Sequence, residues 1–277
     1  MKTKLICADT TKVWPVDNNA VDLIVTSPPY WCLKDYNTRD KQIGYYDSFN
    51  TYLNKMADVY QECIRVLKAE GFLCTVTTDL KTTTSPYEVI PINALTVSIL
   101  STLGMVYEGS IIWRKTARKG NIVNPMFPFP LLRFNYEMIH IFRKTYARSI
   151  LYKESIKAKL LGDGIISTHN PVQKAHPAAF PLAIPMRLIE MYSIPNSIVL
   201  DPFVGSGTTG LACKKLRRDF IGIDNNLEYL TLTGKRLKII TPCIEITGNQ
   251  PSVNASFTDA HSANMLARDF VSRVKII

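Results

Sequence analysis

Six consecutive residues, 26–31, combine a hydroxyl group, two prolines and two aromatic rings in the order Thr-Ser-Pro-Pro-Tyr-Trp. They follow the apolar, β-branched run 21–25, which predicts a buried parallel strand that ends at a proline turn. Because proline has a fixed φ and no N–H group, Pro28 and Pro29 predict a rigid turn whose carbonyl groups point in set directions. Ligands of open α/β sheets bind at the carboxyl ends of strands, so this turn lies where a ligand is expected.

The residue types of this turn suit a planar base that carries an exocyclic amine. The Ser27 oxygen and the Pro28 carbonyl can both accept hydrogen bonds from an NH2 group, and Tyr30 offers a ring face for stacking. An aromatic amine is a poor nucleophile because its lone pair is delocalised into the ring. Two acceptors that draw its hydrogens out of the plane would localise that pair. A loop that merely ends a strand explains so short a motif equally well, so the rest of the chain must decide.

A glycine-rich segment forms a second candidate site in the last third of the chain. It spans residues 202–210 and matches the pattern Gly-x-Gly-x-x-Gly of dinucleotide-binding loops. Asp201 precedes it at the end of a predicted strand, and Asp224 ends the next predicted strand, where a ribose-binding carboxylate belongs. Leu211 stands where a P-loop has its essential lysine, so a P-loop is excluded. The order of strand, glycine loop, helix, strand and acid predicts a nucleoside site.

The charge of Asp201 discriminates between nucleoside ligands. A carboxylate before the glycines would repel the pyrophosphate of NAD and would attract a cation. S-Adenosylmethionine has a sulfonium, an ammonium and a ribose but no phosphate, so electrostatics favour it. An NAD-dependent dehydrogenase is the alternative that the glycine pattern alone allows.

Taken together, the early proline motif and the late segment Asp-Pro-Phe-Val-Gly-Ser-Gly-Thr-Thr resemble the DNA amino-methyltransferases of the permuted β-type group. The resemblance extends to about Ile240 and includes residues 111–115, 136–139 and 176–181. It implies an α/β fold: the circularly permuted, Rossmann-like fold of S-adenosylmethionine-dependent methyltransferases, with a mostly parallel sheet and helices on both faces. Serine before Pro-Pro-Tyr is typical of the cytosine-N4 branch, whereas aspartate marks the adenine-N6 branch.

The resemblance also implies roles for individual residues. The catalytic set would be Ser27, Pro28, Pro29 and Tyr30, acting on the N4 amine of a cytosine flipped out of double-stranded DNA. In the cofactor site, Asp9 would contact the adenine amine, Asp224 the ribose, and Phe203 with the glycine loop the methionine end. The full set of cofactor-binding candidates is Asp9, Asp201, Phe203, Gly205, Gly207, Thr208, Thr209 and Asp224. A companion restriction endonuclease is a possible partner, and the oligomeric state stays open.

Length and composition allow one α/β domain with an insertion or two small domains, and the charge favours a polyanionic partner, nucleic acid before a membrane surface. The chain has 277 residues, 46% of them hydrophobic, and a formal net charge of +10. Segment 115–174 contains eleven lysines or arginines against three acids, a net charge of +8. This segment is predicted to be an inserted target-recognition region of a single methyltransferase domain, 1–277, with Lys115, Arg118 and Lys119 as DNA-binding candidates. A solvated basic face is the alternative, and residues 241–277 form an unassigned tail.

Cysteine and histidine usage argues against metal and disulfide chemistry. None of the six cysteines forms a C-x-x-C pair, and the four histidines lack paired spacing, so we expect no metal site and a reducing, cytoplasmic setting. Asp9 comes too early for the apolar segment of a signal peptide. Residues 89–107 carry no charge, but their polar residues recur on one side, which favours an amphipathic helix over a membrane span.

Alternating periodicities predict the elements that position the two motifs. Strands are expected at 4–8, 21–26, 72–77, 106–113, 198–200 and 220–223. Helices are expected at 49–68, 89–103, 211–216 and 227–240, and one more helix is expected to follow residues 176–181 and to end at 192. Gly71 is expected to close the first of these helices. This alternation favours a mostly parallel sheet with helices on both faces.

Other classes of function remain as alternatives. A cytosine-C5 methylase needs a cysteine nucleophile, and Cys243, the one cysteine after a proline, lies outside the strand and helix pattern. Cys32 is interpreted as a packing residue. The same chemistry on adenine N6 stays open, as does a DNA-binding protein that keeps the fold without activity.

Overall fold

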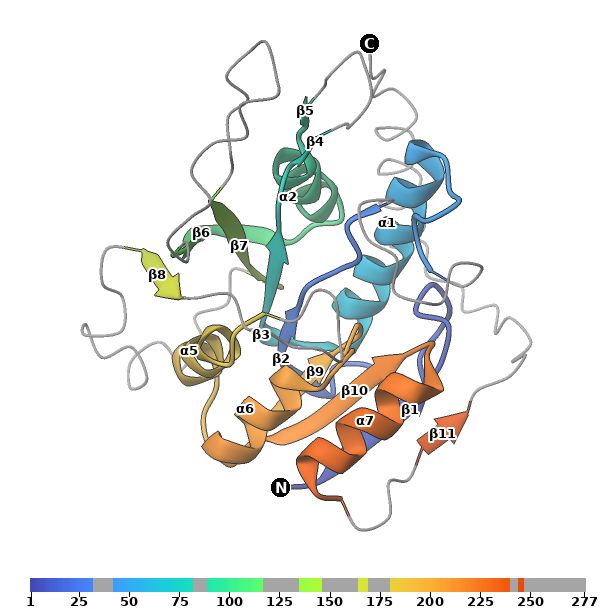
Figure 1. Ribbon diagram of the computed structural model, residues 1–277, viewed down its shortest axis with the longest axis vertical. Helices are drawn as coiled ribbons and strands as arrows, with labels where there is room; N and C mark the ends of the chain where they lie inside the picture. Colours follow the sequence, from blue (N-terminus) through green and yellow to red (C-terminus); the bar gives the residue numbers. More distant parts are fainter. Residues whose placement is uncertain are drawn as a thin grey trace.

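A mixed sheet forms the centre of the molecule in the computed structural model, which describes residues 1–31, 42–81, 89–116, 135–145, 164–168, 180–239 and 244–246 (Figure 1). Within these residues, nine strands follow the order β11-β1-β10-β9-β2-β3-β7-β6-β8. The strands are β1 (Thr3–Cys7), β2 (Val21–Thr26), β3 (Leu67–Thr77), β6 (Val106–Lys115), β7 (Tyr136–Arg143), β8 (Ile165–Thr168), β9 (Ile198–Asp201), β10 (Asp219–Asp224) and β11 (Ile244–Ile246). A small second sheet pairs β4 (Leu80–Lys81) with β5 (Val89–Ile90).

The main sheet is mostly parallel, as predicted. The strands from β11 to β3 all run parallel to their neighbours, and β8 runs parallel to β6. Strand β7 is antiparallel to both β3 and β6, and neither β7 nor β8 was among the predicted strands. Antiparallel pairing places the start of β7 beside the end of β3, where Met138 pairs with Thr77.

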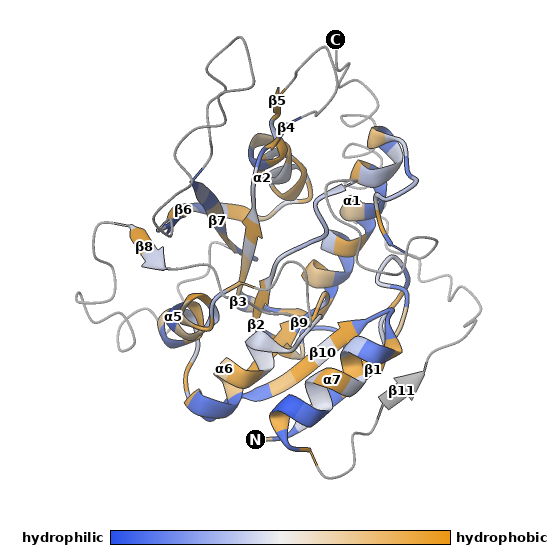
Figure 2. Ribbon diagram, in the orientation of Figure 1, coloured by the Kyte–Doolittle hydropathy of each residue, from blue (hydrophilic) through white to orange (hydrophobic). Residues whose placement is uncertain are grey.

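Helices cover both faces of the sheet, which confirms the predicted layers. Helices α1 (Phe49–Val66) and α2 (Ile92–Thr102) pack into one hydrophobic core. Helices α5 (Ala183–Tyr192), α6 (Thr208–Leu216) and α7 (Leu227–Leu237) pack into a second core. Figure 2 shows the central strands as largely hydrophobic, whereas α1 and α7 each carry hydrophobic and hydrophilic residues, as surface helices do.

The expected end of the first helix at Gly71 is wrong. Helix α1 ends at Val66, and Leu67 already has the extended conformation with which β3 begins. Gly71 lies inside β3, where a Cβ would come within 2.7 Å of the Leu67 side chain and 3.0 Å of the Asp22 carbonyl oxygen. The pairing of β2 with β3 shifts register in this region, and glycine is suited to such an irregularity.

The uncharged stretch 89–107 forms a short helix rather than a membrane span. Residues 89 and 90 pair with β4, and α2 begins at Ile92 after its N-cap Pro91. Proline disfavours the helical conformation in the residue before it, so Ile90 stays extended. None of the helices in the described ranges is long and apolar enough to cross a membrane.

Candidate active site

The two predicted motifs lie on neighbouring strands. Strand β9 lies between β10 and β2, with Asp201 paired with Gly222 on one side and Leu200 paired with Ile24 on the other. Because these strands are parallel, their carboxyl ends meet at one edge of the sheet. The structure therefore brings the glycine loop, the end of β10 and the proline turn together at that edge.

Two aspartates, the buried Asp201 and the partly exposed Asp224, hold the glycine loop in place. Asp201 is 2% exposed and accepts hydrogen bonds from the Phe203 N–H at 3.1 Å and from the Thr209 hydroxyl at 2.7 Å. Asp224 accepts from the Gly205 N–H and from the Asn226 N–H, each at 2.9 Å. Both carboxylates therefore fix the backbone of the loop before any ligand is bound.

Gly207 occupies a position that no other residue fits without strain. Its φ is +77°, and a Cβ here would lie 2.7 Å from the Oγ1 and Cγ2 atoms of Thr233. Thr233 is fully buried, and its hydroxyl donates to the Gly205 carbonyl at 2.9 Å. Gly207 is also the N-cap of α6, so its conformation directs the N-terminus of that helix.

The electrostatics of the loop favour a cationic ligand. Burial raises the pKa of Asp201 to about 6 and that of Asp224 to about 6, although hydrogen bonds to the loop lower both. The like charges of the two carboxylates oppose each other, which raises the pKa of Asp224 further. A bound cation would relieve this repulsion, whereas a pyrophosphate would add to it.

The N-terminus of α6 offers a complementary place for a negative group. Thr208 is buried, and among the described residues its hydroxyl has no hydrogen-bond partner. The N-terminus of a helix carries unpaired N–H groups and a partial positive charge. Acidic residues and a helix N-terminus within one loop fit a ligand that bears both charges, such as the amino-acid end of S-adenosylmethionine.

We expect Thr208→Val to weaken the binding of S-adenosylmethionine about tenfold, because a hydrogen bond to a charged group is lost. The stability of the ligand-free protein should not fall, since the hydroxyl has no partner in the described part of the chain. Calorimetry and thermal unfolding measure the two effects. Thr209→Val is the matched control: its hydroxyl donates to Asp201, so this variant should lose stability without ligand. Equal effects of both variants on stability would contradict this assignment.

The proline turn is held from two sides. The Tyr52 hydroxyl of α1 donates to the Pro29 carbonyl at 3.0 Å. The Tyr30 hydroxyl donates to Glu137 Oε2 of β7 at 2.8 Å and lies 3.0 Å from Ser27 Oγ. A helix and a strand that are distant in sequence therefore fix the conformation of this turn.

Tyr30 is more enclosed than a simple stacking platform would be. Its side chain is 6% exposed, and its hydroxyl belongs to a buried polar chain, whereas Ser27 is partly exposed. The stacking role of Tyr30 stays a prediction.

Glu137 is a site residue that the sequence interpretation missed. It is 6% exposed, and its Oε1 atom pairs with the ammonium of Lys115. Lys115 was a candidate for DNA binding, but its Nζ atom pairs with Glu137 and lies 5.0 Å from the centre of the Trp113 ring. The available signal was that Glu137 is a lone acid among the many basic residues of 115–153. Arg118 and Lys119 lie outside the described residues.

Asp9 lies two residues after the end of β1, at the same edge of the sheet. The Ala8 N–H donates to the Asp224 carbonyl at 3.0 Å, and Asp9 Oδ1 accepts from the N–H and hydroxyl of Thr11 at 2.9 and 2.8 Å. The structure therefore places Asp9 beside the end of β10, close to the candidate ribose ligand Asp224.

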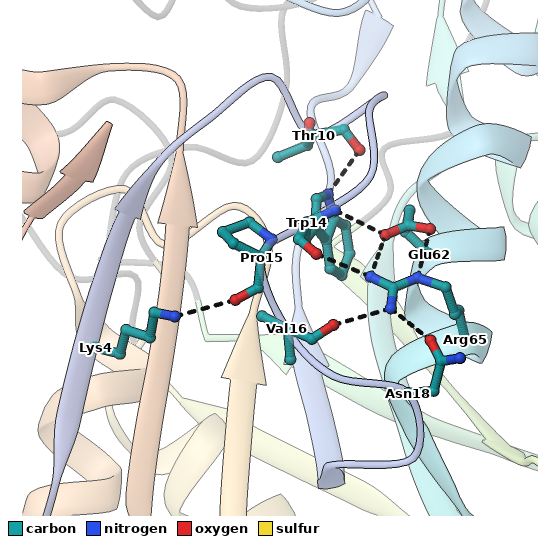
Figure 3. Close-up of polar contacts among 8 residues, drawn as sticks. All are labelled: Lys4, Thr10, Trp14, Pro15, Val16, Asn18, Glu62 and Arg65. Carbon is teal, nitrogen blue, oxygen red and sulfur yellow. Dashed lines mark hydrogen bonds and ion pairs between the residues drawn. The ribbon is translucent and has the colours of Figure 1, made fainter. Parts of the chain in front are cut away.

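A polar network anchors the loop after Asp9 to α1 (Figure 3). Arg65 donates to the carbonyls of Trp14 and Val16 at 3.0 and 2.9 Å and to the Asn18 side chain at 2.7 Å. Glu62 pairs with Arg65 and accepts from the Trp14 N–H at 2.9 Å. We missed this network in the sequence because its partners are separated by about 50 residues.

His140 belongs to a structural network. Its ring nitrogens lie 2.8 Å from Ser110 Oγ and 3.2 Å from Asn93 Oδ1, and burial lowers its pKa to about 4. Within the described ranges, no group of three or more histidine, cysteine or acidic side chains could hold a metal ion.

Known proteins with similar sequences include type II methyltransferases. A type II methyltransferase of Haemophilus parainfluenzae, M.HpaI, is 32% identical over 248 residues, which cover 86% of this chain and 74% of that protein. M.SmaI of Serratia marcescens, also a type II methyltransferase, is 29% identical over 272 residues, covering 84% of this chain and 90% of that protein.

Solved structures agree with the fold. A putative DNA modification methylase of Thermus thermophilus, complexed with S-adenosyl-L-methionine, is 25% identical and superposes with a TM-score of 0.67, covering 90% of this chain and all of that one. The cytosine-N4-specific PvuII DNA methyltransferase has a TM-score of 0.67 at 17% identity, covering 97% and 93% of the two chains, which shows a shared fold. The family model described as DNA methylase, of the N6/N4 type, matches residues 21–235. The chain therefore belongs to the N6/N4 family of DNA methylases.

Proposed function

We propose that this DNA methylase transfers a methyl group from S-adenosylmethionine to the exocyclic N4 amine of a cytosine flipped out of double-stranded DNA. The observation that carries the proposal is the position of the proline turn beside the acidic glycine loop, at the ends of neighbouring strands β2 and β9. An amine held at the turn would face a cationic methyl donor held at the loop.

The glycine loop would hold the methyl donor. Bound S-adenosylmethionine supplies a methyl group on a sulfonium, which is the electrophile of the reaction. Asp201 and Asp224 provide a negative environment, and the N-terminus of α6 with Thr208 provides donors for a carboxylate. Asp9 and Phe203 complete the proposed site at the ends of β1 and β9.

The proline turn would hold the base. An amine inside a duplex cannot reach a cofactor fixed at the edge of a sheet, so the base must leave the stack. Ser27 and the Pro28 carbonyl accept from the amine and localise its lone pair, while Tyr30 lies against the ring. Ser27 stands where the adenine branch has aspartate, which supports cytosine as the target.

The chain order supports membership of the permuted β-type group. The target strand β2 comes first, segment 115–174 lies in the middle, and the cofactor strand β9 comes late. We infer a circularly permuted single domain in which segment 115–174 recognises DNA and Arg118 and Lys119 contact phosphates. A companion restriction endonuclease and a cytoplasmic location are part of the same proposal.

Identification of the modified nucleoside tests the proposal. Plasmid DNA incubated with the protein and S-adenosylmethionine, then digested to nucleosides, should contain N4-methylcytosine by mass spectrometry. N6-Methyladenine as the sole product would move the target to adenine and leave the fold and cofactor unaffected. Cofactor and DNA binding without any methylated product would favour the inactive DNA-binding alternative.

We expect Ser27→Ala to lower kcat about 10- to 30-fold, because its hydrogen bond to the amine strengthens as the lone pair localises. The dissociation constant of S-adenosylmethionine should stay within about twofold, because Ser27 is not part of the cofactor loop. Single-turnover kinetics and calorimetry separate the two quantities. Full activity in this variant would overturn the assigned mechanism.

A further inference from the structure

Glu137 completes a hydrogen-bonded chain that ends at the proposed target amine. Its Oε2 accepts from the Tyr30 hydroxyl at 2.8 Å, and the Tyr30 hydroxyl lies 3.0 Å from Ser27 Oγ. The other carboxylate oxygen, Oε1, pairs with Lys115. Strand β7 brings Glu137 from 107 residues away to the edge of the sheet where β2 and β3 end.

The chain has only one consistent direction. A carboxylate paired with a lysine only accepts hydrogen bonds, so the single hydroxyl hydrogen of Tyr30 goes to Glu137. The Tyr30 oxygen can then only accept from Ser27, which uses the single hydrogen of the Ser27 hydroxyl. The lone pairs of Ser27 Oγ are all that this hydroxyl can present to a substrate. Ser27 is thereby fixed as an acceptor, which is what an NH2 group requires.

We propose that Glu137 is a positioning residue that acts through Tyr30 to keep Ser27 an acceptor, and that it makes the site selective for a base with an exocyclic amine. This inference rests on the proposed function. Lys115 has a part in it as well, because its ammonium holds one oxygen of Glu137 and leaves the other to Tyr30.

Substitution by glutamine should reverse the chain. The Lys115 ammonium requires an acceptor, so the amide oxygen of Glu137→Gln would face Lys115 and the amide NH2 would face Tyr30. Tyr30 would then accept from the amide and donate to Ser27, and the Ser27 hydrogen would point at the incoming amine. The Ser27 hydroxyl and the NH2 group of the base would then both be hydrogen-bond donors, whereas in the wild-type protein the Ser27 oxygen is the acceptor.

Two further variants distinguish an effect on the direction of the hydrogen bonds from a general structural effect. Tyr30→Phe removes the link, so Ser27 can rotate freely and Glu137→Gln should add little in this background. The double variant Glu137→Gln with Lys115→Met removes the cation, so the amide can turn its oxygen back to Tyr30. This double variant should recover most of the selectivity that the single variant loses.

The test uses two duplexes that contain the sequence methylated by the wild-type protein. In one duplex the target base is intact, and in the other it is an analogue without the amine, pyrimidin-2-one for cytosine or purine for adenine. Fluorescence anisotropy in the presence of S-adenosylhomocysteine gives the dissociation constant of each duplex. The contribution of the phosphate contacts is the same for both duplexes, so it cancels in the ratio of the two constants. Single-turnover kinetics with S-adenosylmethionine gives the methylation rate, and thermal unfolding checks that each variant is folded.

We expect the wild-type protein to prefer the duplex with the amine about tenfold, and Glu137→Gln to lose that preference, consistent with one hydrogen bond gained or lost. The methylation rate of Glu137→Gln should fall about 20-fold with unchanged cofactor affinity. In the Tyr30→Phe background the same substitution should change the rate less than about twofold, because coupled residues are not additive.

Several results would overturn the inference while the proposed function stands. The first is that the wild-type protein methylates DNA but does not prefer the duplex with the amine. The second is that Glu137→Gln keeps both the methylation rate and the preference. The third is that Glu137→Gln lowers the methylation rate as much in the Tyr30→Phe background as in the wild-type protein. A double variant with no recovery would also contradict it. If the wild-type protein forms no methylated base, the proposed function itself fails, and the inference fails with it.

Discussion

Replacing Gly207 with alanine is expected to abolish measurable binding of S-adenosylmethionine and to lower the free energy of unfolding by about 2–4 kcal/mol. The added Cβ would meet the buried Thr233 side chain at 2.7 Å, and the φ of +77° is strained for any residue with a Cβ. Relief of the contact requires either Thr233 or the loop to move. Movement of Thr233 would release the Gly205 carbonyl, and movement of the loop would displace the N-terminus of α6.

Gly104→Ala is the matched control for this prediction. Gly104 also has a positive φ, +89°, but a Cβ there would have no atom within 4 Å. The control should therefore lose only about 1 kcal/mol from backbone strain and should keep full cofactor affinity. Denaturant unfolding and calorimetry on both variants measure the difference. Equal losses in the two variants would show that strain, not the contact with Thr233, determines the effect.

Asp201→Asn is expected to stabilise the ligand-free protein at pH 8 by up to about 3 kcal/mol and to weaken S-adenosylmethionine binding by tenfold or more. Burial raises the pKa of Asp201 from 3.8 to about 6, so the ionised form costs stability in the folded state. Asparagine keeps an acceptor for the Phe203 N–H and places an amide donor beside the Thr209 hydroxyl. It removes a charge that a cationic ligand would otherwise compensate.

The pH dependence distinguishes this effect from ordinary repacking. Because the folded-state pKa is raised, wild-type stability should fall as pH rises from about 4 through about 6, where the folded protein holds the proton that the unfolded chain loses. The advantage of Asp201→Asn should therefore be full at pH 8 and absent near pH 4. Unfolding of both proteins across this range, with the exposed Asp17→Asn as a control, measures it. A difference that is independent of pH would contradict the prediction.

The elements that carry the two motifs could be predicted because their sequences have simple patterns. The apolar run before the proline turn predicted β2 with its observed bounds, 21–26. The glycine loop was found between two strands that both end in an aspartate, as predicted. The methyltransferase fold is confirmed by the solved structures, one of them in complex with S-adenosyl-L-methionine. The choice of cytosine and the roles of single residues remain predictions.

Strand β7 and its site residue could not be predicted from local patterns. Glu137 and His140 are buried in β7 and interrupt the apolar pattern by which a buried strand is detected. Each is satisfied by partners that the sequence does not place nearby, Lys115 and Tyr30 for Glu137 and Ser110 and Asn93 for His140. Long-range pairing of this kind is visible only once β3, β7 and β6 lie side by side.

The order of strands in the sheet constrains how the chain can fold during its synthesis on the ribosome. β1 and β2 precede β9 and β10 in the sequence, yet β10 and β9 lie between them in the finished sheet. A nascent chain that has emerged only as far as β7 therefore lacks both partners of β1, which are β10 and β11, and lacks β9 on one side of β2, whose other side pairs with β3. Exposed strand edges of this kind promote aggregation. β9 and β10 are synthesised late and must insert between β1 and β2, which are synthesised earlier. The cofactor half of the site therefore joins the target half only late in folding.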